Sequence, residues 1–164
     1  YVSLYKGLLG VRGAVLAAAQ DVLDEVAVWR RRLGGNIPDA WPLAAAALVG
    51  LDEQLPRMPA FRDHAVALAA AINADGVART VPTVPLTPLF HVHLPASSEA
   101  VDGAHAALQA EGGPQLYGYL RSSPDPDRCA FEISVGENAM EFTADEVAKA
   151  IRRLVDLTAR AART

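Results

Sequence analysis

The fold is decided by the stretch Ser3-Leu4-Tyr5-Lys6-Gly7-Leu8-Leu9-Gly10-Val11-Arg12-Gly13-Ala14-Val15-Leu16-Ala17. Residues 1–5 are β-prone and partly alternate between apolar and polar side chains, which is typical of a short strand. Residues 11–17 form a second apolar run, and glycines interrupt the segment between the two runs. The pattern therefore predicts two short strands joined by a glycine-rich turn around Lys6.

Lys6 is the residue in this stretch that can carry chemistry. The chain has only one other lysine, Lys149, which lies on the polar side of the last predicted helix. Desolvation by apolar neighbours favours the neutral form of a lysine side chain, and a neutral amine can attack a carbonyl to form a Schiff base. The alternative is a lysine that extends into solvent from a strand end. The local sequence leaves both interpretations open.

Three helices are expected after the second strand. Asp21 is the predicted N-cap of the first, Arg30 to Arg32 fall in its last turn, and Gly34-Gly35 ends it. The apolar stripe expected on this helix consists of Val22, Val26, Trp29 and Leu33. A second helix is expected from Pro38 to about Glu53, and a third from about Pro59 to Ala74. Residues 1–78 are thus read as one part of the chain.

Residues 79–164 have a different organisation. An extended connector over 80–88 precedes strands expected at 89–94, 116–120 and 130–135. Helices are expected over 98–111, with Ser97 or Ser98 as the cap, and after Thr143, where Glu146 completes a capping box. The order β-α-β-β-α predicts a small α+β domain.

Composition narrows the function classes. The net charge of −4 argues against a general affinity for nucleic acid, because such proteins usually carry a basic excess. The single cysteine, Cys129, excludes an internal disulfide and a cysteine-cluster zinc site. No apolar run reaches the roughly 18–20 residues of a membrane-spanning helix, and no signal peptide is visible. We therefore expect a soluble, cytoplasmic protein that contacts neither nucleic acid nor membrane.

The segment from Ser3 to Ala17 resembles the cofactor-lysine segment of pyridoxal-phosphate enzymes of the aminotransferase fold. It is most similar to the threonine aldolase and β-eliminating lyase family, in which a small hydroxyl residue precedes Lys-Gly and glycine-rich turns follow. Trp29-Arg30-Arg31-Arg32-Leu33-Gly34-Gly35 resembles the basic helix end and glycines of that family. The similarity covers nearly all of this chain and the second half of a typical member. It implies an α/β fold: the C-terminal part of the large cofactor-binding domain at 1–78 and the small C-terminal domain at 79–164.

The resemblance implies roles for four residues. Lys6 would hold pyridoxal phosphate as a Schiff base and then act as an acid or base. Ser3 would donate a hydrogen bond to the phosphate, and its alternative is a strand-end hydroxyl. Arg31 would approach the phosphate or the neighbouring subunit's site, and its alternative is a solvated helix end. Arg12 is a further phosphate candidate, at a position where the family does not regularly place arginine.

One departure concerns the substrate carboxylate. Family members usually present an arginine on a C-terminal strand to hold it, whereas the matching strand here carries Glu132. Two ionised carboxylates repel each other, so Glu132 cannot take over that role while charged. Arg128 is near in sequence and is expected in the turn.

The motif His91-Val92-His93 could contribute to a zinc site if a third ligand converged on it. No carboxylate or cysteine at a diagnostic spacing accompanies the two histidines, so surface or packing roles are favoured. We expect no metal.

The resulting prediction is a carbon–carbon lyase similar to threonine aldolase that acts on a β-hydroxy amino acid with pyridoxal phosphate. The alternatives are a β-eliminating amino-acid lyase of the same fold, or a non-catalytic α/β interaction module derived from it. The resemblance implies a homodimer or homotetramer and a preceding N-terminal half that supplies most cofactor contacts. We therefore expect the 164 residues alone to be inactive and to bind pyridoxal phosphate poorly.

Overall fold

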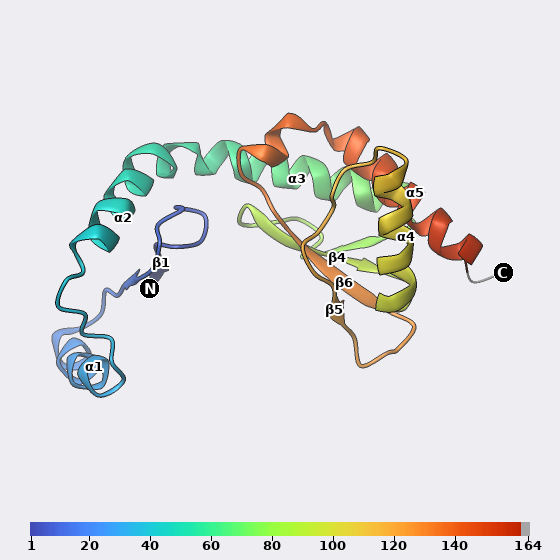
Figure 1. The fold of residues 1–164 in the computed structure, drawn as a ribbon. Helices are drawn as coiled ribbons and strands as arrows, with labels where there is room; N and C mark the ends of the chain where they lie inside the picture. The colour runs from blue at the N-terminus through green and yellow to red at the C-terminus, as the bar shows by residue number, and fades with distance from the viewer. Residues whose placement is uncertain (162–164) are drawn as a thin grey trace. The chain divides into compact units, whose positions relative to one another are not determined.

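The computed structural model describes residues 1–161, and it consists of two units that meet between Met58 and Pro59 in the sequence (Figure 1). Each unit is described by itself below. The division at residues 78 and 79 concerns the domains of a longer protein, and it stays a prediction because contacts within this chain do not test it.

The first unit begins with the predicted pair of strands. β1 (Val2–Ser3) and β2 (Ala14–Val15) pair antiparallel, with Ser3 opposite Ala14. The helices that follow are α1 (Gln20–Arg32), α2 (Trp41–Glu53) and the short 3-10 helix η1 (Leu55–Arg57). The strand–turn–strand expectation is confirmed, with strands of two residues each.

The ends of α1 match the prediction on one side only. Asp21 is not the N-cap: Ala19 holds that position without a side-chain hydrogen bond, and Asp21 lies in the first turn. At the other end Gly34 has φ +75°, and the Gly35 N–H donates to the Arg30 carbonyl at 2.7 Å. The predicted glycine stop is therefore confirmed, because this backbone conformation suits a residue without a side chain.

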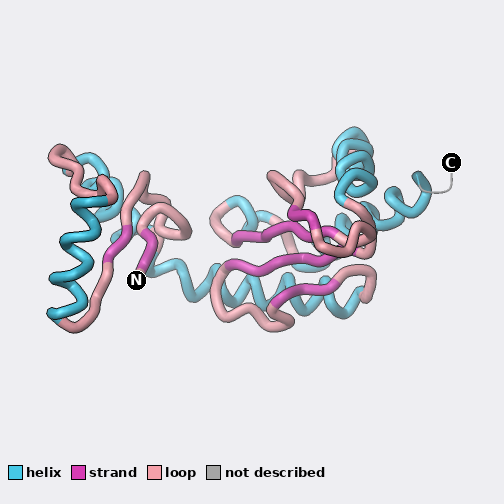
Figure 2. The backbone as a smooth tube through the Cα atoms, turned by 90° about the horizontal axis from the view of Figure 1, so that it is seen from below, coloured by secondary structure: helices cyan, strands magenta, loops and turns pink. Residues whose placement is uncertain are grey.

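The second unit is built on a four-stranded antiparallel sheet in the order β3-β4-β6-β5. The strands are β3 (Arg79–Val81), β4 (Leu89–Leu94), β5 (Arg121–Ser122) and β6 (Cys129–Ser134). The helices are α3 (Met58–Asp75), α4 (Ser98–Ala110) and α5 (Ala144–Ala161), with the 3-10 helix η2 (Asn138–Glu141) before α5. Figure 2 shows α3 running behind the strands.

The core of this unit lies between the helices and one face of the sheet. Phe90, Val92 and Phe131 are fully buried on that face. Leu68 and Ile72 of α3, Val101 of α4, and Ile151 and Leu154 of α5 complete the core. The alternation along β4 places His91 and His93 together on the opposite face.

Caps fix two helix starts where the sequence places them. The Ser97 hydroxyl accepts from the Ala100 N–H at 3.3 Å. At α5 the Thr143 N–H donates to the Glu146 carboxylate at 2.7 Å, and the Glu146 N–H donates to the Thr143 hydroxyl at 3.3 Å. The predicted capping box is confirmed.

The strand predicted at residues 116–120 is wrong. The Leu116 N–H donates to His105 Nε2 at 3.1 Å, so it is not available to a sheet. Tyr117 stacks on the His105 ring at a centroid distance of 4.2 Å, and its hydroxyl donates to Asp102 at 3.1 Å. These contacts with α4 hold Leu116 and Tyr117 away from the sheet, and the strand begins only at Arg121, as β5.

Candidate active site

The backbone of the turn that carries Lys6 is closed by three hydrogen bonds. The Leu9 N–H donates to the Lys6 carbonyl at 2.8 Å, and the Gly10 N–H donates to the Leu4 carbonyl at 2.8 Å. Below them the Leu4 N–H donates to the Gly13 carbonyl at 3.0 Å. Lys6 is exposed, whereas Leu8 is buried, so the turn is anchored by one side chain and presents the amine to its surroundings.

Two glycines let the backbone approach this closely. A Cβ at Gly10 would lie 2.5 Å from the Leu4 carbonyl oxygen, and a Cβ at Gly50 would lie 1.9 Å from the Leu8 carbonyl oxygen. Gly50 belongs to α2, so α2 packs directly on the backbone of the lysine turn. The turn is thus fixed at both its base and its side.

The structure brings three of the four predicted site residues onto one hairpin. Ser3 is half-buried on β1, Lys6 lies in the turn, and Arg12 is exposed between the turn and β2. Arg31 is exposed on α1, and within residues 1–161 no hydrogen bond or ion pair joins it to the other three. The hairpin offers an accessible amine, a hydroxyl and a guanidinium, which are the groups that an aldehyde and an oxyanion require.

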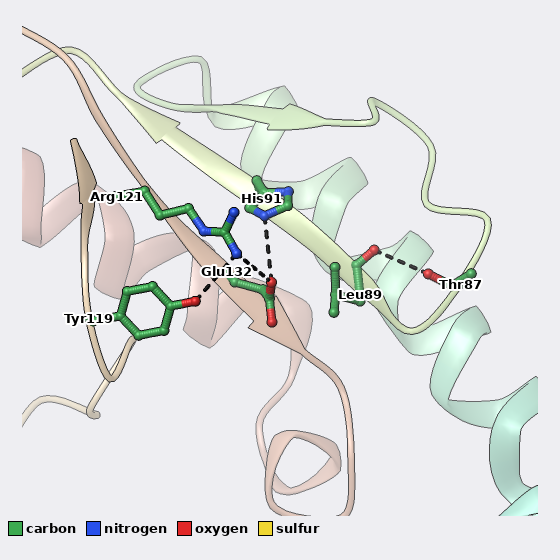
Figure 3. A network of polar contacts seen from close by, with 6 residues as sticks. All are labelled: Thr87, Leu89, His91, Tyr119, Arg121 and Glu132. Atoms are coloured by element: carbon green, nitrogen blue, oxygen red, sulfur yellow. Dashed lines mark hydrogen bonds and ion pairs between the residues drawn. The ribbon is translucent and has the colours of Figure 1, made fainter. Parts of the chain in front are cut away.

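The second cluster of polar side chains lies on the sheet face opposite the core (Figure 3). Glu132 on β6 is paired with His91 on β4 in the strand register. The Glu132 carboxylate lies 3.6 Å from His91 Nε2 and accepts a hydrogen bond from Arg121 at 3.3 Å. Arg121 donates a second bond to the Tyr119 hydroxyl, also at 3.3 Å.

Arg121 is a residue that the sequence reading did not single out. Only the strand register reveals that Arg121 lies near the site. β5 pairs Arg121 with Ala130, which brings Arg121 near Glu132, two residues further along β6. Arg128 lies in the turn, as expected, and pairs with Asp125 at 3.1 Å. No group of three metal-ligating side chains is found in residues 1–161, so the two histidines have no third ligand there.

Buried titratable groups elsewhere in this unit serve packing. Burial raises the pKa of the Cys129 thiol to about 11, so the thiol stays protonated at neutral pH. Burial and the hydrogen bond to Asp102 raise the pKa of Tyr117 above its ordinary value. Burial lowers the pKa of His105, which keeps its ring neutral and able to accept from Leu116.

In the part of the chain that the structure describes, no helix is both long and apolar enough to cross a membrane.

Known proteins resemble this chain over part or most of its length. No family model matches the chain. A low-specificity L-threonine aldolase of Arabidopsis thaliana is 36% identical over 72 residues, which are 44% of this chain and 20% of that protein.

Two solved structures match almost the whole chain. A protein from Listeria monocytogenes, provisionally described as an L-allo-threonine aldolase, has a TM-score of 0.80 and 33% identity over 95% of this chain and 43% of its own. A protein from Exiguobacterium sp. 255-15, provisionally described as an aromatic amino acid β-eliminating lyase/threonine aldolase, has a TM-score of 0.78 and 30% identity over 94% and 43%. This chain therefore spans less than half the length of the relatives it matches.

The fold class expected from the sequence, the C-terminal part of this α/β enzyme fold, is confirmed by the two structures. Over almost its whole length the chain is similar to the C-terminal part of proteins described as threonine aldolases and β-eliminating lyases.

Proposed function

We propose that the protein carrying these residues is a pyridoxal-phosphate-dependent lyase that cleaves the Cα–Cβ bond of a β-hydroxy amino acid. The products are glycine and an aldehyde: the hydroxyl proton is lost, the carbonyl forms, and Cα takes up a proton. When bound, the cofactor withdraws electrons from the substrate Cα and so lets a bond at that carbon break. The observation that carries the proposal is Lys6, an exposed amine on a turn pinned by backbone contacts, in a chain that is similar to a threonine aldolase structure.

The residues of the hairpin fit the cofactor in kind. The Lys6 amine would bond to its aldehyde carbon and, once displaced by substrate, would move a proton at Nζ. Ser3 on the same hairpin would donate to the phosphate, and Arg12 and Arg31 would supply positive charge. The pinned backbone favours this use, because a positioned amine loses little freedom on reaction.

The same residues support a second candidate. The Exiguobacterium relative carries β-eliminating lyase in its name, and the alternative reaction expels a leaving group from Cβ. The two differ in products: glycine plus an aldehyde for the aldolase, and loss of the Cβ substituent for the lyase. We also propose that the protein is cytoplasmic and acts as a homo-oligomer. Light scattering would measure its oligomeric state.

The test uses the fact that the chain has two lysines. The protein carrying this chain is incubated with pyridoxal phosphate, reduced with borohydride and digested, and the modified peptide is identified by mass. Modification of Lys6, and its loss in Lys6→Ala but not in Lys149→Ala, supports the assignment. Lys149 is a matched control because it is exposed on α5 and its ammonium is held by Asp145.

Activity is measured on the same variants with threonine, serine and aromatic amino acids. Retained cleavage of β-hydroxy amino acids in Lys6→Ala would show that Lys6 does not carry the reaction. Absence of modification and of every activity in the wild-type protein would favour the interaction module.

A further inference from the structure

The sheet face opposite the core carries a group of charged and imidazole side chains in two neighbouring rows. Residues directly opposite in antiparallel strands share a face, and so do residues two apart along a strand. One row therefore contains Arg79, His93, Ala130 and Arg121, and the next contains Val81, His91 and Glu132. In Figure 3 the helices lie behind the sheet and the labelled polar side chains lie in front.

The guanidinium of Arg121 is oriented with donors to spare. Both of its hydrogen bonds, to Tyr119 and to Glu132, leave from Nη2. Its Cζ also lies 5.9 Å from the centre of the Tyr119 ring, which holds the plane of the group. Since arginine has five N–H donors, those on Nε and Nη1 remain for another acceptor.

His91 offers a further polar atom. Its Nε2 is buried and has no hydrogen-bond partner among the described residues, because Glu132 at 3.6 Å is too far for a good bond. The side chains of His91 and Glu132 are 28% and 29% exposed, so the pair is partly shielded from solvent. An acceptor with two oxygens is the group that would satisfy both His91 and Arg121.

The face has a positive excess. Arg79 and Arg121 are both cationic, against the single carboxylate of Glu132 within the two rows. The pKa of His93 is held below its ordinary value first by burial and then by the positive charges of Arg79, His91 and Arg128. An anion approaching this face is therefore attracted.

We propose that this face binds a carboxylate between Arg121 and His91, and that Glu132 is an internal counter-ion that orients Arg121 but weakens the binding. Arg121 donates from its remaining nitrogens, and His91 donates from Nε2. The carboxylate comes from an amino acid, and in this respect the assignment rests on the proposed function. The binding itself is a property of residues in the second unit and is measured without cofactor.

The experiment follows the histidine ring resonances of the 164-residue chain by NMR at constant ionic strength. Sodium acetate, glycine and inorganic phosphate are added in separate titrations, with sodium chloride as the compensating salt. We expect saturable shifts of His91 with acetate and glycine. Arg121→Gln weakens binding at least about tenfold, which is the loss of a charge-assisted hydrogen bond.

Glu132→Gln gives the sharper test because it separates the counter-ion from a simple support. Removing a like charge near the ligand tightens acetate binding about fivefold, the value for a repulsion of about 1 kcal/mol. Arg62→Gln is the matched control: it removes one positive charge from a pair with Asp63 on α3, and it leaves the affinity unchanged.

Several results would overturn the proposal. These are the absence of saturable shifts, an equal effect of Arg121→Gln and Arg62→Gln, weaker binding in Glu132→Gln, or a preference for phosphate over both carboxylates. The unperturbed resonances of Phe90 and Phe131 report that each variant is folded. Borohydride labelling of Lys6 is independent of all these readouts, so failure of this proposal and failure of the lyase proposal are distinguished.

Discussion

The contact between α2 and the lysine turn yields a prediction that compares two glycine-to-alanine substitutions in helices. Ala is favoured over Gly in a helix interior by about 1 kcal/mol, so each substitution alone should stabilise its helix. At Gly103 in α4 a Cβ meets nothing within 4 Å, so Gly103→Ala should raise the free energy of unfolding by about that amount. At Gly50 the Cβ would lie 1.9 Å from the Leu8 carbonyl oxygen.

A carbon–oxygen contact needs more than about 3 Å, so Gly50→Ala moves α2 and the turn apart by roughly 1 Å. Overpacking of this kind costs about 1–3 kcal/mol, and the atom that is struck is backbone and cannot rotate away. We therefore expect net destabilisation of the first unit by about 0–2 kcal/mol after the helix gain is deducted. Lys6 modification by pyridoxal phosphate should fall as well, because the turn loses its support.

The assay is urea unfolding followed by two signals. Both tryptophans, Trp29 and Trp41, lie in the first unit, so their fluorescence reports that unit alone. Circular dichroism reports both units. The prediction is refuted if Gly50→Ala stabilises the first unit, measured by tryptophan fluorescence, as much as Gly103→Ala stabilises the second. That result would show that α2 does not approach the lysine turn closely.

Three further predictions concern pH, capping and local stability. Because burial holds the folded-state pKa of His105 below the unfolded value of 6.5, its contribution to stability is complete above that pH and is lost as the pH falls below it. Denaturant unfolding at a series of pH values should show this loss, and His105→Gln should reduce it while leaving the contribution of His93, whose pKa is also lowered. An unchanged profile contradicts the assignment. Ser97→Ala removes the acceptor of the α4 cap and should lower stability by about 1 kcal/mol, whereas Ser98→Ala, one residue inside the helix, should cost less. Amides of the first unit should exchange with deuterium faster than those of β4 and β6, since α1 buries none of its residues; equal protection would contradict this.

Local signals were predicted well from the sequence. The capping box at Thr143 and Glu146 and the glycine stop after α1 are set by interactions between residues close in the chain. Such interactions are encoded by spacing, and nothing distant competes with them. The lysine turn belongs to the same class, since its closure needs only residues 4 to 13.

The failures have distant causes. The strand expected at 116–120 is lost to contacts with α4, where His105 takes the Leu116 N–H and Tyr117 packs on its ring. Arg121 became visible as a site candidate only through its pairing with β6. Neither effect has a periodic signature, because each depends on which segments meet in three dimensions.

The apolar stripe on α1 shows what a periodic sequence pattern can and cannot predict. Spacings of three and four predicted an apolar face, and the helix forms, yet Trp29 is 48% and Leu33 79% exposed. A period identifies which side of a helix avoids water, but it carries no information on what covers that side. Exposed apolar groups in contiguous patches mark surfaces that other polypeptide contacts. The two solved relatives have more than half of their length outside the match with this chain. The lysine turn and the apolar stripe therefore differ in kind: the turn is closed by hydrogen bonds among residues 4 to 13, whereas the stripe is left exposed by the described residues.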